Sequence, residues 1–78
     1  MNQIYVIYDC IRKKYVSQII KLPHHNGPFL SIKFGDVYSA IAFDYYRLAK
    51  DRVDEIYSWF FKNCPEKKMN LSVRRIHA

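Results

Sequence analysis

The first apolar positions of the chain follow a two-residue period. Ile4, Val6 and Tyr8 alternate with the side chains between them, which predicts a β-strand over residues 3–9. Apolar and polar residues alternate again in the stretch MNLSVRRIH near the other end of the sequence. This second alternation predicts a strand over residues 69–76, so both ends of the chain are expected to lie in a sheet.

Two further apolar runs lie in the stretch PFLSIKFGDVYSAIAF. They are separated by Gly35 and Asp36, a pair that suits the positive backbone dihedral angles of a tight hairpin turn. The pattern therefore predicts strands over residues 29–34 and 37–43, joined by a two-residue turn.

The stretch DYYRLAKDRVDEIYSWFFKN has the period of an α-helix. Asp44 is a candidate N-cap, and Pro65 prevents the helix from continuing far beyond Asn63. A helix is therefore expected over residues 44–62. Its apolar stripe consists of Tyr45, Leu48, Ala49, Val53, Ile56 and Phe60.

Residues 10–22 fit two different structures. As a helix they would be capped by Asp9 and stopped by Pro23, and the chain would have a ferredoxin-like β-α-β-β-α-β order. As a strand they would use β-branched residues that favour a sheet, and we favour this strand over residues 15–20. In either case residues 1–78 are expected to form a single α+β domain, with an antiparallel sheet and one long helix packed on one face.

The composition is that of a chain that folds in water. Half of the residues are apolar and 17% are aromatic, which is too many for a disordered segment, and no apolar run is long enough to cross a membrane. The first residues lack the pattern of an export signal, so the cytoplasm is the expected compartment. Cys10 and Cys64 are predicted to be small buried residues, and a disulfide between them is left open.

The net charge of +6 is unevenly placed along the sequence. Residues 1–33 carry +4, residues 34–61 carry −2 and residues 62–78 carry +4. If the two ends meet in the sheet while the middle forms the helix, positive potential is concentrated on one side of the molecule. Such a concentration is typical of proteins that bind phosphate groups.

The sequence contains no familiar catalytic motif. G-x-G-x-x-G, P-loop and G-x-S-x-G patterns are missing, so we assign no catalytic residue and expect no cofactor. His24, His25 and His77 have no further ligands at metal-binding spacing, and no metal site is predicted. Asp51 and Asp54 are expected on the solvent face of the helix and not in a catalytic pair.

The layout of the chain is similar to that of many small phage-encoded proteins of unassigned role. A KYVS strand is followed by DVYSAIAFDYYRLAK, which leads into the helix, and by a last short strand. The residues that carry the resemblance are Lys14, Tyr15, Val16, Ser17, Ala40, Phe43, Asp44 and Ala49. The resemblance implies a non-enzymatic part that binds a host or defence component, such as an inhibitor or an antitoxin.

Cations and aromatic residues are interleaved along the predicted strands. Cations can hold phosphates while rings stack on unpaired bases, a combination that favours RNA. The predicted nucleic-acid-binding residues are Arg12, Lys13, Lys14, Tyr15, Lys33, Lys67, Lys68, Arg74 and Arg75, with Tyr5, Phe29 and Tyr38 as further aromatic residues. The expected function is non-catalytic binding of nucleic acid or of a nucleic-acid-processing enzyme.

Two alternative functions are kept. A metal-independent ribonuclease needs only a general acid, a general base and cations. His24, His25, His77, Tyr15, Arg74 and Arg75 would supply these groups. The second alternative is a protein-binding module, because the helix has more aromatic surface than one sheet face covers. Its predicted interface residues are Tyr46, Tyr57, Trp59 and Phe61, and the partner would be another protein or a second copy of the chain.

Overall fold

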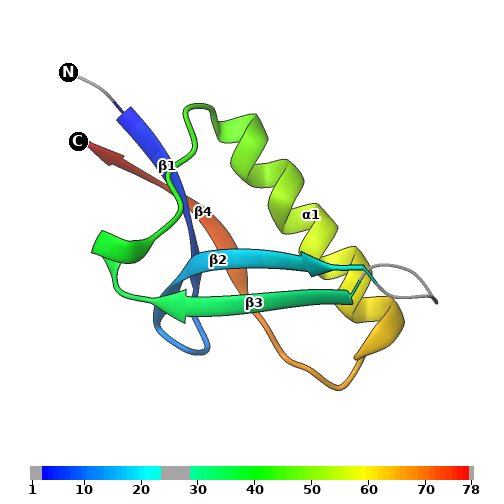
Figure 1. Ribbon diagram of the computed structural model, residues 1–78. Helices are drawn as coiled ribbons and strands as arrows, with labels where there is room; N and C mark the ends of the chain where they lie inside the picture. The colour runs from blue at the N-terminus through cyan, green and yellow to red at the C-terminus, as the bar shows by residue number, and fades with distance from the viewer. Residues whose placement is uncertain (1–2, 24–28, 78) are drawn as a thin grey trace.

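The computed structural model describes residues 3–23 and 29–77 (Figure 1). The elements in chain order are β1 (Gln3–Asp9), β2 (Lys14–Leu22), β3 (Phe29–Gly35), a 3-10 helix η1 (Val37–Ser39), α1 (Tyr46–Asn63) and β4 (Leu71–His77). The four strands form one antiparallel sheet in the order β3-β2-β1-β4, and α1 packs against it. The predicted α+β class, with an antiparallel sheet and one long helix, is confirmed.

The two ends of the chain lie side by side in the sheet. β1 and β4 pair along their whole length, from Gln3 opposite His77 to Asp9 opposite Leu71. Figure 1 shows this as the blue and red strands running next to each other. The expectation that both chain ends meet in one sheet is therefore correct.

β1 and β2 pair over a much shorter length. Their register covers only Tyr8 opposite Tyr15 and Asp9 opposite Lys14, after which the two strands diverge. The segment that follows η1 enters the space between them. Tyr5 and Phe43 exchange two backbone hydrogen bonds of 2.9 Å, which tie this segment to β1.

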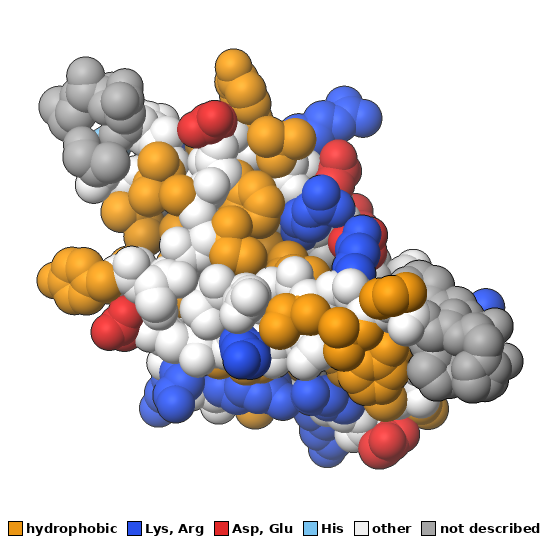
Figure 2. All heavy atoms as spheres, in the orientation of Figure 1, with side chains coloured by type: hydrophobic (Ala, Val, Ile, Leu, Met, Phe, Trp, Pro, Cys, Tyr) orange, Lys and Arg blue, Asp and Glu red, His pale blue; other side chains and the backbone are white. Residues whose placement is uncertain are grey.

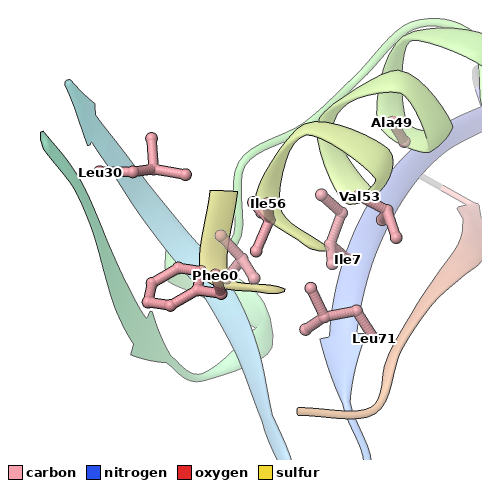
Figure 3. Packing of buried hydrophobic residues seen from close by; sticks show 8 residues of the cluster. Ile7, Leu30, Ala49, Val53, Ile56, Phe60 and Leu71 are labelled. Carbon is pink, nitrogen blue, oxygen red and sulfur yellow. The ribbon is translucent and has the colours of Figure 1, made fainter. Parts of the chain in front are cut away.

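A single cluster of buried side chains joins α1 to the sheet (Figure 3). It consists of Ile7, Val16, Leu30 and Leu71 from the strands and Ala49, Val53, Ile56 and Phe60 from α1. Four residues of the predicted helical stripe are therefore buried as expected. The other two are not, since Tyr45 is 69% and Leu48 is 49% exposed. Leu48 precedes Ala49 by one residue, a rotation of about 100° around the helix axis, which takes it off the narrow buried stripe.

The predicted strand over residues 37–43 is wrong, and the sheet has four strands instead of five. The Gly-Asp pair does not form a hairpin turn. The Asp36 carboxylate accepts a hydrogen bond of 3.0 Å from the Ser39 N–H, which caps η1 and turns the chain away from β3. Asp is favoured both in hairpin turns and at helix N-caps, and here the cap prevails.

The strand interpretation of residues 10–22 is correct, and the helical, ferredoxin-like alternative is wrong. β2 begins at Lys14 and residues 10–13 form a turn. The predicted cap of α1 is also wrong, because the helix begins at Tyr46 and its N-cap is Tyr45, which makes no side-chain capping bond. In the described part of the chain no helix is long and apolar enough to span a membrane.

Candidate nucleic-acid interface

The turn between β1 and β2 is built on a buried carboxylate. Asp9 has no exposed surface, and its carboxylate accepts hydrogen bonds from the backbone N–H groups of Ile11 (2.9 Å) and Asn70 (3.3 Å). Arg12 donates a third bond of 2.6 Å through Nη1. Burial raises the pKa of the Asp9 carboxyl, but the bonds from Arg12 and the backbone outweigh burial and hold the pKa below its ordinary value.

Arg12 therefore has a structural role in the turn. Besides its ion pair with Asp9, its Nη1 donates to the Lys68 carbonyl at 3.2 Å, and its Cζ lies 4.7 Å from the centre of the Phe34 ring. These contacts join the turn to β3 and to the segment before β4. We leave Arg12 out of the binding surface considered below, because its charge is already balanced by a buried carboxylate.

Lys13 and Lys14 complete the turn with exposed side chains. Lys13 has a φ of 57°, the left-handed region, and its N–H donates to the Asp9 carbonyl at 2.8 Å. Lys14 begins β2 opposite Asp9. Within the described residues neither lysine has an ion-pair partner. Figure 2 shows Lys and Arg side chains gathered along the lower edge of the molecule, where Figure 1 draws this turn.

The face of the sheet that points away from α1 is called the outer face. Ile7 packs against α1, so its neighbours Val6 and Tyr8 point to the outer face. Residues directly opposite in the ladder share a face, which places Tyr15 beside Tyr8 and Arg74 beside Val6.

Four outer-face side chains form a row across the sheet, and we call them the outer row. They are Lys33 of β3, Tyr15 of β2, Tyr8 of β1 and Arg74 of β4. The Arg74 Cζ lies 3.6 Å from the centre of the Tyr8 ring, and the Tyr8 and Tyr15 ring centres are 4.9 Å apart at an interplanar angle of 61°. Lys33 lies diagonally across from Tyr15, since Gly35 is the direct partner of Tyr15.

The sheet strands carry an excess of cations, whereas the helix carries both signs of charge in nearly equal number. The four strands contain five cations and one carboxylate, and that carboxylate is the buried Asp9. No carboxylate therefore lies on the outer face of the strands. The helix carries four cations and three acids, and two of the acids, Asp54 and Glu55, form ion pairs with Lys50, Arg52 and Lys21.

The other predicted nucleic-acid-binding residues lie elsewhere. Arg75 is opposite Tyr5 and so shares the α1 side of the sheet, while its neighbour Arg74 is on the outer face. Lys67 and Lys68 lie in the segment before β4, on the rim of a cavity beside the end of α1. The structure brings Tyr15 and Arg74 together around Tyr8, with Lys33 diagonally across from Tyr15 on the same face, and places Arg75, Lys67 and Lys68 off that face.

Tyr8 is the functional candidate that the sequence pattern missed. It was assigned to a strand, but nothing in the sequence links it to Arg74, because that contact depends on the pairing of β1 with β4. Three of the predicted aromatic residues lie off the outer face, and Tyr5, which packs against the core on the α1 side, is one of them. Tyr38 is in η1 and 94% exposed, and Phe29 packs against Trp59 with ring centres 5.2 Å apart.

The predicted protein-interface residues fall into separate places along α1. Tyr46 lies at its start with its ring 6.1 Å from that of Tyr5, and Trp59 is half-buried near its end. Tyr57 and Phe61 line the cavity beside the C-terminal end of the helix, where Phe61 is 83% exposed.

The groups proposed for a ribonuclease do not converge in the described part of the chain. His77 lies beside Gln3 at one end of β1, and Tyr15 lies beside Tyr8, five residues or about 17 Å further along the strand. His24 and His25 lie outside the described residues. Among the residues that the structure describes, no three His, Cys, Asp or Glu side chains are close enough to hold a metal ion.

Both cysteines are free thiols. Cys64 is half-buried, but Cys10 is exposed, so the prediction that both are buried is wrong for Cys10, which lies in the turn after β1.

Comparisons of the chain with protein-family models, curated proteins and solved structures give no match.

Proposed function

We propose that this protein binds single-stranded nucleic acid, with RNA favoured, through the outer row and without catalysis. The observation that supports the proposal is the position of Arg74, whose guanidinium lies over the Tyr8 ring on a sheet face without carboxylates. The remaining plane of that guanidinium and its N–H groups are available to a ligand. An arginine held in this way can stack on a base and donate to a phosphate at the same time.

The neighbouring side chains extend the binding surface in both directions. Tyr15 is half-buried, so part of its ring is available for stacking, and Lys33 is exposed at the β3 end of the row. Lys13 lies in the turn next to Tyr8 and Tyr15 and would hold a phosphate on that side, whereas Lys14, opposite Asp9, lies on the α1 side of the sheet. Bases would contact the rings while the backbone follows the cations.

Single strands fit this surface better than a duplex. The bases of a duplex are stacked inside the helix, and their edges are reached mostly by a helix or ribbon in the major groove. The only long helix of the described chain carries three acids among its four cations, so it offers phosphates a less uniformly positive surface than the outer face does. Unpaired bases, which proteins recognise mostly in RNA loops and ends, can instead lie flat on exposed rings.

The proposal is tested by measuring the affinity for a fluorescein-labelled single-stranded RNA oligomer over a range of salt concentrations. Each phosphate neutralised contributes about −0.7 to the slope of log K against log salt concentration for a single strand. We expect a slope steeper than about −2, weaker binding of the matching duplex, and intact RNA after incubation in EDTA. An affinity that does not respond to salt, or no binding at low salt, would contradict the proposal.

A cytoplasmic location and a role as inhibitor or antitoxin stay predictions. They follow from the composition and from the layout of the chain. A pull-down from host extract, with and without nuclease treatment, would show whether a ribonucleoprotein is the partner.

A further inference from the structure

A second surface lies on the α1 side of the sheet, at the C-terminal end of the helix. It is a cavity of about 400 Å³ between the last turns of α1 and residues 64–70, and we call it the α1–β4 groove. Its walls are mainly apolar, with Ile11 from the β1–β2 turn, Phe61 from α1 and Met69 from the segment before β4. A cleft of this size can take one or two large side chains or a small ligand.

The apolar walls of the groove are open to solvent. Phe61 is 83% and Ile11 is 55% exposed, although both are large hydrophobic residues. Adjacent apolar side chains left exposed on a small domain mark an interaction site more often than isolated ones do. The walls are also held in place, because the Tyr57 hydroxyl accepts a 2.7 Å hydrogen bond from the Leu71 N–H.

The charged groups on the groove all have the same sign. Lys67 and Lys68 line it, while Glu66, the acid next to them in the sequence, does not. Within the described residues neither lysine forms an ion pair. The Lys67 Nζ lies 4.9 Å from the centre of the Phe60 ring, which places this ammonium group at the rim, and the bond from Arg12 to the Lys68 carbonyl fixes the backbone beside it.

We propose that the α1–β4 groove binds a short acidic peptide segment of a partner protein. A large apolar side chain of the peptide enters between Ile11 and Phe61, and carboxylates beside it pair with Lys67 and Lys68. The positive charge of the rim favours a negatively charged peptide, and the apolar walls favour a hydrophobic side chain as its anchor. A nucleobase fits these walls less well, because its polar edges would be left without hydrogen-bond partners.

The test is a selection for binding from a library of random displayed peptides, with the immobilised protein as the target. We expect the enriched peptides to combine an aromatic or leucine residue with Asp or Glu. Purified peptides should bind the Phe61→Ser variant and the Lys67→Ser/Lys68→Ser double variant at least about tenfold more weakly than the unchanged protein. Tyr38→Ser is the matched control, since Tyr38 is an exposed aromatic residue far from the groove in sequence. The affinity of this variant for the peptides should equal that of the unchanged protein.

Several results would overturn the proposal. Failure to enrich any peptide, enrichment of basic or purely polar peptides, or equal binding by the Phe61→Ser variant would each do so. So would loss of RNA binding in Phe61→Ser, which would assign the groove to nucleic acid. A dimer of the unchanged protein that Phe61→Ser converts to monomer, measured by sedimentation, would assign the groove to a second copy of the chain. Peptide binding does not require the outer row, so it can fail or succeed independently of RNA binding.

Discussion

At the scale of single residues, Asp9 explains why Arg12 follows the first strand. Its carboxylate is buried and needs a charged donor, which Arg12 supplies together with two backbone N–H groups. We expect Asp9→Asn to lower the free energy of unfolding by about 2 kcal/mol, because bonds to a charged acceptor are lost or weakened. Urea unfolding measures this change. Asp44→Asn, at an exposed carboxylate, should change stability little, and an equal loss in both variants would contradict the assignment.

The pH dependence of stability follows from the same carboxylate. Its pKa in the folded protein is below the ordinary value of 3.8, so Asp9 binds its proton less readily in the folded chain than in the unfolded chain. Its contribution to stability is therefore complete above pH 3.8 and is lost as the pH falls through the lower folded pKa. Asp9→Asn should show a smaller loss of stability on acidification than the unchanged protein. Parallel curves for the two proteins would contradict this prediction.

Lys13 occupies a backbone conformation that suits glycine or asparagine. With a φ of 57° it carries a strain of about 1 kcal/mol that either substitute would relieve. Lys13→Gly and Lys13→Asn should raise the thermal midpoint, whereas Lys13→Ala, which removes the same charge and keeps the strain, should not. If Lys13→Ala stabilises as much as the other two, charge repulsion in the turn is the cause instead of backbone strain.

At the scale of elements, α1 begins without a side-chain cap. Tyr45 is the N-cap residue with an extended backbone, and its exposed ring cannot accept a bond from the first turn. Tyr45→Ser should therefore raise the free energy of unfolding by about 1 kcal/mol over Tyr45→Ala, since serine can accept a hydrogen bond from a free N–H. Circular dichroism during thermal unfolding compares the two variants, and equal midpoints would show that the cap is not limiting.

The elements with a clear hydrophobic period were predictable from the sequence. The alternation around Val6, the alternation around Val73 and the helical stripe from Ala49 to Phe60 each gave an element of the right type. The segment after β3 was not predictable in this way. A Gly-Asp pair suits both a hairpin and a helix cap, and the choice depends on the bonds between Ser39 and Asp36 and on the pairing of Phe43 with Tyr5.

At the scale of the whole molecule, folding leaves the outer face of the described strands with cations and no carboxylate. Pairing of β1 with β4 places both basic chain ends in one sheet, and the acids of the middle lie mainly on α1. That separation could be expected from the charge pattern. Which cation meets which ring could not, because it depends on strand register, and register placed Arg74 over Tyr8 while turning Arg75 to the other side.

Arg74 and Arg75 therefore provide a matched pair for testing the binding surface. They are adjacent, carry the same charge and differ in the face of the sheet to which they point. We measure the affinity of the Arg74→Ala and Arg75→Ala variants for one labelled single-stranded RNA oligomer at several salt concentrations. Arg74→Ala should bind about tenfold more weakly and lose about one phosphate from the salt slope, while Arg75→Ala stays close to the unchanged protein. Equal losses in the two variants, or a larger loss in Arg75→Ala, would show that the outer face is not where nucleic acid binds.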